Sequence, residues 1–243
     1  GTSWNNYNSP NESVIRSVKN IDDKIYIGSH SDFGYFQRLN NGTFKYTSLV
    51  NLLNLNIEED EEFWNILLLD NWIIFQSISR LIFIDKNNND VKYLKFKGII
   101  NNSFSIDKQI YIALDTGLFK LVNGQPEPII DSNQLPSHIV NIFYSPSGML
   151  ILTANNGFYH LKESGLVSKF SSPLDSFKDD LSVFSAIQLS DLSFAIGSVG
   201  QGLFLLDSNF KNLQKIDKSM GLANNTVLSL YEDSNKNIWL GLD

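Results

Sequence analysis

Short runs of apolar residues recur along the chain at a nearly constant spacing. Each run is five residues long and ends in a small or polar residue, and the runs occupy 24–28, 72–76, 109–113, 149–153, 193–197 and 237–241. Their closing residues lie 48, 37, 40, 44 and 44 positions apart. Apolar runs bounded by turn residues predict β-strands, and a period of this length is typical of one blade of a β-propeller.

Three further segments keep register with each of these runs. A second strand, opened in most units by glycine, follows at 34–36, 81–83, 117–119, 157–159 and 202–204. A strand that precedes the run is predicted at 14–18, 64–69, 103–106, 139–144, 183–189 and 226–232, and a weaker last strand at 44–47, 91–96, 128–130, 166–170 and 213–216. Turn residues separate these segments, and glycine suits the tight reversals because it accepts positive φ. Each complete unit therefore has four strands, A to D in chain order.

The recurrence predicts an all-β fold, a β-propeller of four-stranded antiparallel blades. About five and a half blades are expected in a single segment over 1–243, with approximate limits at 13–49, 61–97, 100–131, 138–171, 182–217 and 226–243. A β-sandwich of similar hairpins is the alternative, and it accounts less well for the repeated register of strands B and C. No helix longer than two turns is expected.

The sixth unit contains only strands A and B, which leaves an open sheet edge. The segment from Trp4 to Tyr7 is one candidate to close the ring, but a short polar segment cannot supply both missing strands. We therefore expect that the chain is a fragment of a longer protein, and that the complete ring has seven blades.

Composition narrows the classes of function. The 243 residues carry a net charge of −7, so we expect no nucleic acid to bind this segment, because an acidic surface repels phosphate. The absence of cysteine excludes disulfides, thiolate zinc sites and cysteine nucleophiles. No apolar run reaches the roughly 18 residues that a membrane-spanning helix needs.

The last unit resembles a repeat of a known family. It is similar to the two-component regulator propeller repeat at Gly221, Leu222, Asn225, Val227, Asp233, Trp239 and Gly241. The turn glycine of that repeat is absent, and Lys236 or Asn237 stands in its place. Asparagine tolerates the left-handed conformation better than most residues. At the other end of the chain, residues 27–36 are similar to a blade of propeller proteins that also carry a triple-tyrosine domain.

The resemblance implies a role that the residues alone do not show. Propellers of this family form the sensor part of membrane-anchored bacterial regulators, on the periplasmic or extracellular side of the inner membrane. A triple-tyrosine domain, a transmembrane helix and a histidine kinase or helix-turn-helix module usually follow. The implied partners are a small ligand such as an oligosaccharide, the membrane-proximal domain of the same protein, and a second copy in a homodimer. Kinase activity, DNA binding and any membrane contact would belong to other parts of the parent protein.

Antiparallel blades place successive turns on alternating faces, so the B–C turns and the D–A connections share one face. Propellers usually bind ligands where such loops converge. The candidate ligand-binding residues on this face are His30, Ser31, Asp32, Trp64, Asp115, Thr116, Asn155, Asn156, Ser198 and Gln201. Amides and hydroxyls match the hydroxyl groups of a sugar, and an aromatic ring such as Trp64, Tyr26 or Tyr111 stacks on its apolar side. The same polar residues also form turns that bind nothing, and a place in the blade core is the simpler interpretation of Trp64 and Trp239.

Other chemistry finds little support in the sequence, and we predict no catalytic residue, metal site or cofactor. His30, His138 and His160 lack the spacing of a zinc site. Residues 233–237 begin like a calcium loop but lack its glycine and its final glutamate. Five consecutive carboxylates at 58–62 offer a site for a cation or a basic partner, but we interpret them as a solvated loop of mutually repelling charges.

The sequence therefore predicts a non-catalytic, extracytoplasmic sensor propeller of a signal-transduction regulator. A carbohydrate-active propeller enzyme, a glycoside hydrolase or lyase, is the first alternative. It would need two carboxyl groups in one pocket, and Asp32 and Asp115 are the pair to test. A purely structural platform for protein interactions is the second alternative.

Overall fold

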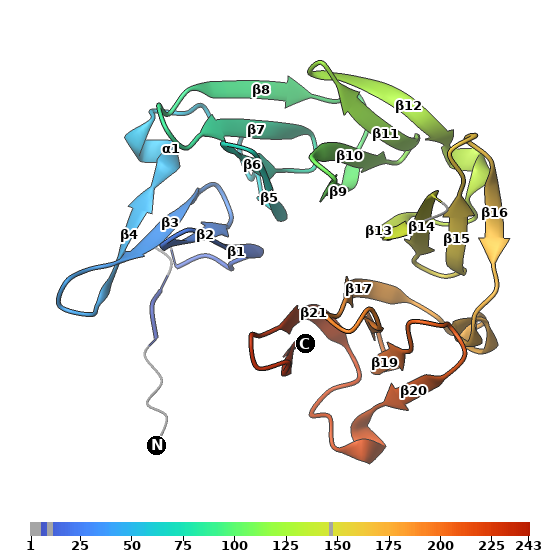
Figure 1. The fold of residues 1–243 in the computed structure, drawn as a ribbon. Coiled ribbons are helices and arrows are strands. Elements are labelled where there is room, and N and C mark those ends of the chain that lie inside the picture. The colour runs from blue at the N-terminus through green and yellow to red at the C-terminus, as the bar shows by residue number, and fades with distance from the viewer. Residues whose placement is uncertain (1–5, 9–11, 146–147) are drawn as a thin grey trace. The chain divides into compact units, whose positions relative to one another are not determined.

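A computed structural model describes residues 6–8, 12–145 and 148–243 (Figure 1). The described chain forms five sheets of four strands and a sixth sheet of two strands. Within each sheet the strands lie side by side in chain order. The predicted series of four-stranded antiparallel blades with an incomplete sixth is confirmed, and the sheets are called blades 1 to 6 below.

The first three blades occupy the N-terminal half of the chain. Blade 1 comprises β1 (Ser17–Ile21), β2 (Lys24–Gly28), β3 (Phe33–Arg38) and β4 (Phe44–Ser48), and the short helix α1 (Leu49–Leu52) follows it. Blade 2 comprises β5 (Asn65–Leu69), β6 (Trp72–Gln76), β7 (Arg80–Asp85) and β8 (Val91–Lys95). Blade 3 comprises β9 (Ile100–Ile106), β10 (Gln109–Leu114), β11 (Gly117–Val122) and β12 (Gln125–Asp131).

The remaining blades are connected by short 3-10 helices. After η1 (Ser132–Gln134), blade 4 comprises β13 (Ile139–Ser145), β14 (Gly148–Thr153), β15 (Gly157–Leu161) and β16 (Val167–Phe170). After η2 (Pro173–Phe177), blade 5 comprises β17 (Val183–Gln188), β18 (Phe194–Ser198), β19 (Leu203–Leu206) and β20 (Leu213–Ile216). After η3 (Lys218–Met220), blade 6 comprises β21 (Val227–Glu232) and β22 (Ile238–Leu242). None of the helices formed by the described residues is long and apolar enough to span a membrane.

The chain divides into two compact units. Unit 1 consists of residues 1–114 and 120–126 and contains blades 1 and 2, together with β9 and β10. Unit 2 consists of residues 115–119 and 127–243 and contains blades 4, 5 and 6. Strands β11 and β12 contribute residues to both units.

Stacked aromatic rings hold the blades of unit 1 together. Phe33 of blade 1 lies 4.1 Å from Phe75 of blade 2 and 4.6 Å from Phe63, measured between ring centroids. All three rings are fully buried. Each buried ring of this size contributes roughly 2–3 kcal/mol to stability, because its apolar surface is removed from water. This packing holds the facing sides of blades 1 and 2 together.

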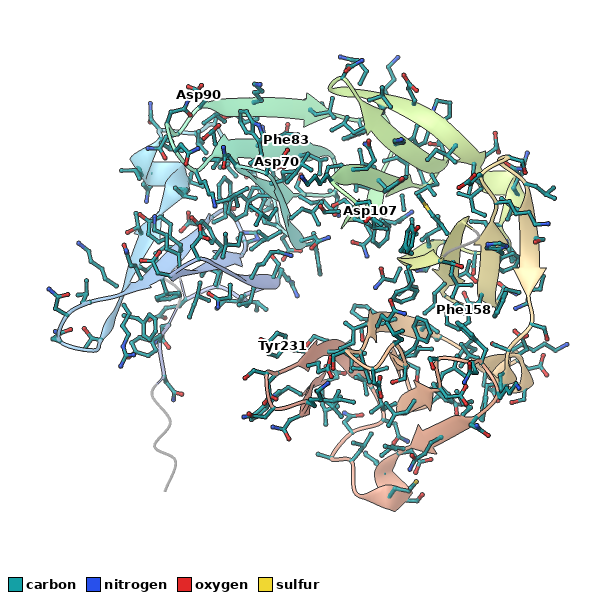
Figure 2. The ribbon with its side chains drawn as sticks, in the orientation of Figure 1. Asp70, Phe83, Asp90, Asp107, Phe158 and Tyr231 are labelled. Atoms are coloured by element: carbon teal, nitrogen blue, oxygen red, sulfur yellow. The ribbon has the colours of Figure 1, made fainter. Side chains whose placement is uncertain are left out.

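Unit 2 uses the same kind of packing between blades 4 and 5. Phe158 of β15 lies between these two blades (Figure 2), with its ring 5.9 Å from Phe194 and 5.4 Å from Phe210. Phe204 packs against Phe177 of η2 at 4.9 Å. The connection from β16 to β17 is therefore part of the core rather than a free loop.

A repeated hydrogen bond joins the first strands of neighbouring blades. Near the start of strand A, a serine or asparagine side chain donates to a backbone carbonyl of the next blade, and we call this contact the inter-blade latch. The latch residues with their acceptors are Ser17 with Phe63 (2.9 Å), Asn65 with Ser103 (2.8 Å), Asn141 with Ala186 (2.6 Å) and Ser185 with Val227 (3.3 Å). A serine reaches the carbonyl two residues before the equivalent position in the next blade, and the longer asparagine reaches the carbonyl one residue after it. In blade 3 the equivalent position is Asn102, which pairs with Ala113.

The serine latches explain the glycine that closes several of the repeated runs. Ser17 pairs across its hairpin with Gly28, and a Cβ at Gly28 would lie 2.5 Å from Ser17 Oγ and 2.6 Å from the Phe63 carbonyl oxygen. Ser185 pairs with Gly197 under the same constraint. Where the latch is an asparagine the space is free for a larger residue, as in the pair of Asn65 with Gln76.

The beginning of blade 1 differs from the prediction. The sequence pattern places the first strand at 14–18, whereas β1 covers Ser17–Ile21. A two-residue turn accounts for the shift, because Asp22 adopts a positive φ of 54° and lets Ile21 pair directly with Lys24. Trp4, the first residue of the predicted closing segment, lies outside the described residues. Tyr7 packs its ring edge-on against Phe36 and Phe44 of blade 1.

Candidate ligand-binding face

In unit 1, the B–C turn of blade 1 and the connection from β4 to β5 lie side by side. The backbone N–H of Ser31 donates to the carbonyl of Glu61 at 2.7 Å, and the N–H of Phe63 donates to the carbonyl of Ser29 at 3.1 Å. The two segments thus form a short, hydrogen-bonded surface at the end of blade 1. This is the common face that alternation of the strands predicts for such loops.

The candidate residues His30 and Asp32 point in different directions on this surface. His30 is partly exposed, bridges to Glu62 through the backbone, and places Nε2 3.5 Å from a carboxylate oxygen of Asp60. Asp32 is buried, and its two oxygens accept hydrogen bonds from Ser48 Oγ at 2.6 Å and from Tyr46 Oη at 3.1 Å. Burial and the adjacent Asp32 carboxylate raise the pKa of Tyr46, so this phenol remains a hydrogen-bond donor. Asp32 therefore fixes blade 1 from within.

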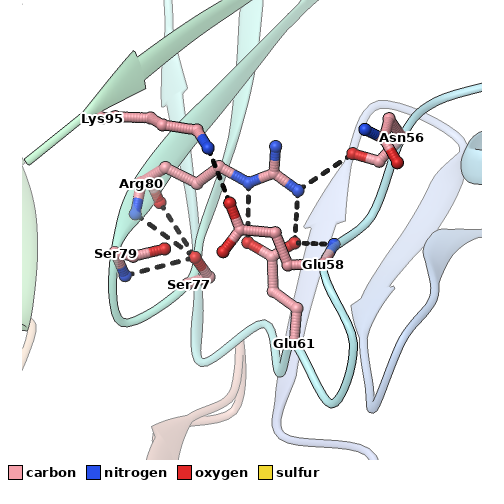
Figure 3. Close-up of polar contacts among 7 residues, drawn as sticks. All are labelled: Asn56, Glu58, Glu61, Ser77, Ser79, Arg80 and Lys95. Atoms are coloured by element: carbon pink, nitrogen blue, oxygen red, sulfur yellow. Dashed lines mark hydrogen bonds and ion pairs between the residues drawn. The ribbon is translucent and has the colours of Figure 1, made fainter.

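The acidic run at 58–62 is solvated in part: Glu58, Glu59 and Asp60 are exposed, as the sequence suggested, whereas Glu61 is buried. Glu61 and Arg80 form a buried, two-point ion pair, in which Arg80 Nε donates to Glu61 Oε1 at 2.7 Å and Arg80 Nη2 donates to Glu61 Oε2 (Figure 3). Glu58 pairs with Lys95 at 2.6 Å. The burial of Glu61 was not predicted, because a local charge count cannot see cations such as Arg80 and Lys95 on strands farther along the chain.

The Glu61–Arg80 pair ties the connection between blades 1 and 2 to the B–C turn of blade 2. Burial by itself would raise the pKa of Glu61, but the hydrogen bonds from Arg80 and Ser77 hold it below its ordinary value, so the carboxylate stays charged. Arg80 also donates to the carbonyl of Asn56 at 3.0 Å. A buried ion pair is maintained only when its remaining donors and acceptors are satisfied, and here the surrounding backbone satisfies them.

The side chain of Trp64 is exposed on this face, and neighbouring residues hold it in place. Its backbone N–H donates to the carbonyl of Gln76 at the end of β6, which places the ring beside the B–C turn of blade 2. The guanidinium carbon of Arg16 lies 4.6 Å from the ring centroid, and Arg16 is held by two hydrogen bonds to Glu62 at 3.0 and 2.8 Å. The ring is 41% exposed, so the interpretation of Trp64 as a blade-core residue is wrong.

The other aromatic residues considered from the sequence behave in the opposite way. Tyr26 is only 5% exposed and packs on Phe75, and burial raises its pKa to about 12. Tyr111 is also buried. Neither ring offers a stacking surface to a ligand, because both are buried, Tyr26 beneath Phe75 of the neighbouring blade. Trp239, in contrast, is 53% exposed, so the interpretation of Trp239 as a blade-core residue is wrong.

The candidate residues of unit 2 are divided between surface and interior. Asp115 and Thr116 are exposed in the turn before β11. Asn155 is exposed and its amide donates to the carbonyl of Leu181 at 2.8 Å, while Asn156 is partly exposed. Gln201 accepts from Lys215 at 2.8 Å, and Ser198 is fully buried with its hydroxyl donating to Gly202. Ser198 thus stabilises its own turn and does not reach the surface, whereas Asn155 and Gln201 contact segments farther along the chain.

Three exposed aromatic residues of unit 2 were missed by the sequence reasoning. Tyr144 of β13, Phe184 of β17 and Tyr231 of β21 all lie on first strands of their blades and are more than half exposed. The sequence did contain a signal, because successive side chains of a strand point to opposite faces. Each of the three residues adjoins a residue that is buried or packed, as Tyr144 follows the buried Phe143.

The turn between β21 and β22 is organised by Asp233. Its Oδ1 accepts the backbone N–H groups of Asn235 and Asn237 at 2.8 and 2.9 Å, and its Oδ2 accepts from the Asn237 amide at 2.9 Å and the Trp239 indole at 2.8 Å. These hydrogen bonds, with the one from the Asn237 side chain as the largest cause, lower the pKa of Asp233 from 3.8 to about 2. The residues that begin like a calcium loop therefore form a self-contained hairpin turn.

We expect the Trp239 indole to report the protonation of Asp233. The folded-state pKa lies below the unfolded value of 3.8, so the contribution of the carboxylate is fully present above that pH and is lost as the pH falls through about 2. The indole N–H resonance, followed by NMR, should shift with a midpoint near the lower value, and the Asp233→Asn variant should show no such titration. A midpoint at the ordinary aspartate value would contradict the hydrogen-bond assignment.

The geometry of unit 1 is suited to binding rather than to proton transfer. It presents an exposed indole with a fixed guanidinium on it, beside a partly exposed imidazole and several carboxylates. An aromatic ring flanked by charged hydrogen-bonding groups can stack on an apolar surface and orient polar substituents around it. The most deeply buried acid, Glu61, is neutralised by Arg80 and does not face a ligand.

Comparison with solved structures defines the class of protein: the fold is a β-propeller. The chain is similar to the WD40 β-propeller domain of Doa1, with 10% identity, coverage of 90% of this chain and 72% of that one, and a TM-score of 0.65. It is also similar to the extracellular domain of BT4673 from B. thetaiotaomicron, assigned in one structure as a one component system and in another as a hybrid two component system. Both structures have 17% identity and cover 98% of this chain, with TM-scores of 0.73 and 0.72.

One family model matches the C-terminal end of the chain. Residues 221–243 match the model of the two component regulator propeller family, which confirms the resemblance drawn from the last unit. No curated protein sequence matches the chain. The chain spans about one third of the length of the BT4673 extracellular domain, 33% and 32% in the two structures.

Proposed function

We propose that this propeller segment is the extracytoplasmic, non-catalytic sensor part of a bacterial signal-transduction regulator, and that it binds a small ligand at the face around Trp64. The regulator repeat in blade 6 and the likeness to an extracellular domain of a regulatory system support the class of function. The observation that carries the site is the exposed Trp64 ring, held in place by Arg16 and Glu62.

An oligosaccharide is the ligand class that this surface fits best. A sugar ring has an apolar side that stacks on an indole, and its hydroxyl groups take hydrogen bonds from guanidinium and imidazole groups and donate them to carboxylates. Arg16 and Glu62 supply such groups next to Trp64, and His30 pairs through its backbone with Glu62 on the same surface. Because the Glu61–Arg80 pair fixes the backbone that carries Trp64, the platform is ordered before a ligand binds, which lowers the entropy cost of binding.

The same surface supports binding more than glycoside cleavage. A glycosidase needs one carboxyl group that accepts and one that donates a proton at the scissile bond. Asp32, one of the two carboxylates considered for that role, is buried and has each oxygen engaged by a hydroxyl group of blade 1. Its position is explained by the stability of the blade.

Replacing Trp64 with alanine is expected to abolish saturable oligosaccharide binding. The loss of one stacking ring from a small-ligand site should weaken binding by about tenfold or more, roughly 1.5–3 kcal/mol. Trp72→Ala is the matched control, because Trp72 carries a cation in the same manner, with Lys92 Nζ 4.4 Å from its ring centroid, but lies beside the A–B turn at the opposite end of β6.

The measurement is isothermal titration of the 243-residue chain with a panel of neutral and acidic oligosaccharides, each variant being compared by its melting temperature with and without sugar. Binding that is lost in Trp64→Ala and retained in Trp72→Ala supports the proposal. Equal loss in both variants would place the ligand elsewhere, and no binding to any sugar, together with capture of a defined protein partner, would favour an interaction platform instead.

A further inference from the structure

Lys19 occupies a position of the repeat that is apolar in the other complete blades. It lies two residues after the latch residue of blade 1 and pairs across its hairpin with Tyr26. The residues at the same register position of blades 2 to 5 are Leu67, Phe104, Phe143 and Ile187. The first three are buried, and Ile187 packs against a buried cluster of blades 5 and 6. A lysine at this position is therefore an exception within the repeat.

The side chain of Lys19 faces the junction between blades 1 and 2, both of which are complete. Alternate residues of a strand point to the same side, so Lys19 shares the side of β1 from which Ser17 donates its latch hydrogen bond. Ile21, the next residue on that side, is 4% exposed and belongs to the buried cluster that includes Ile66 of blade 2. Lys19 itself is partly buried, so its amine lies against apolar surface and keeps contact with solvent.

The amine of Lys19 lacks a counter-charge. Among residues 6–8, 12–145 and 148–243, none forms an ion pair or a hydrogen bond with its side chain. The nearest carboxylates along the chain have other partners. Asp22 pairs with Lys86 at 2.9 Å, and Asp23 accepts a hydrogen bond from Gln37 at 3.0 Å. Burial without a counter-charge disfavours an ammonium group and lowers the pKa of Lys19 from its ordinary value of 10.5.

We propose that Lys19 is a covalent modification site, at which the amine condenses reversibly with a small aldehyde. The lone pair of Nζ attacks the carbonyl carbon, so that a C–N bond forms and the carbonyl oxygen takes up a proton. The nitrogen then gives up its remaining protons, the oxygen leaves as water, and an imine results. The step needs neither an oxidant nor a reductant. Lysines in apolar surroundings are suited to this chemistry, because the uncharged amine is the nucleophile.

A small aldehyde is the class of reactant that fits the position. The junction between the blades covers part of the side chain, which restricts access by a bulky electrophile. The condensation requires no further reagent and no second catalytic group, and none is supplied at Lys19. The site is also independent of the surface around Trp64, so the proposal stands or falls separately from oligosaccharide binding.

The test is incubation of the 243-residue chain with acetaldehyde at pH 7, reduction of the imines with borohydride, and mass spectrometry of the peptides. Lys45 is the exposed reference. Lys24 is the partly buried reference, and its ammonium lies 4.2 Å from the ring centroid of Tyr35, a contact that favours the cation. Each unit by which a pKa is lowered gives about tenfold more free amine, so Lys19 should be modified several-fold more than either reference.

The same measurement at pH 10.5 separates the charge of the amine from its access to solvent. An ordinary lysine is then about half uncharged, so the preference for Lys19 should fall to about twofold or less. In the Lys19→Met variant, which has an apolar side chain as in the other blades, only the modified peptide around residue 19 should disappear. Equal or weaker modification of Lys19 at pH 7, or a preference that is unchanged at pH 10.5, overturns the proposal. Both of these measurements use the parent chain and do not depend on the folding of the variant.

Discussion

The Arg80→Met variant is expected to lose about 3–5 kcal/mol of unfolding free energy, the typical cost when one partner of a buried ion pair is removed. The reason lies in Glu61, which would remain buried with no counter-charge to balance it. Chemical denaturation of the parent chain and the variant at neutral pH measures the difference. Because the pKa of Glu61 is lowered in the parent and would be raised in the variant, the deficit should begin to shrink while the pH is still above about 4, the ordinary pKa of a glutamate, and should go on shrinking below it.

The double variant Glu61→Leu with Arg80→Met serves as the control for this result. It removes both charges and retains similar volume, so it should be considerably more stable than Arg80→Met alone. Equal destabilisation in the single and double variants would mean that lost packing, and not an unpaired carboxylate, accounts for the effect. A single variant as stable as the parent would show that Glu61 reaches solvent when Arg80 is absent.

The Gly28→Leu variant should be destabilised by about 3 kcal/mol, at the upper end of the range for overpacked cores. The new side chain would occupy the space of Ser17 Oγ and press on the Phe63 carbonyl, so it would break the latch and separate blades 1 and 2. Ser17→Ala, which removes only the hydrogen bond, should cost about 1 kcal/mol. Denaturation curves of both variants give the comparison.

Gly241→Leu is the matched control for the latch. It stands at the same register position in blade 6, where a Cβ would approach only Ser229 Oγ, and that side chain is exposed and free to rotate. We expect a loss of less than 1 kcal/mol, as for other surface substitutions. Similar losses for Gly28→Leu and Gly241→Leu would show that the glycines serve the hairpin itself and not the contact between blades.

The repeat frame was predictable from the sequence because each hairpin has a local signal. Alternating apolar residues and turn residues define strands B and C without reference to distant parts of the chain. The boundary of β1 was misplaced because the positive φ of Asp22 permits a two-residue turn that favours glycine or asparagine in most sequences. Local patterns therefore fixed the number and order of the strands better than their ends.

The candidate surface was predicted less well, because it depends on contacts between distant residues. The pairing of Glu61 with Arg80 joins residues 19 positions apart, and that of Arg16 with Glu62 joins residues 46 apart. Neither separation has a signature in a single sequence. The exposure of Trp64 follows from its place just before β5. There, the neighbouring residue Phe63 has a buried ring and Trp64 has an exposed one.

The latch also bears on how such a chain diverges over time. Each junction that carries a latch depends on one small polar side chain and on a main-chain oxygen. Every residue type supplies that oxygen equally well, provided that the backbone keeps its conformation. Substitutions in the accepting strand therefore leave the junction intact, and gain or loss of a whole blade recreates it at the new boundary. A lineage built in this manner can change most of its side chains, and even its blade number, while the architecture persists.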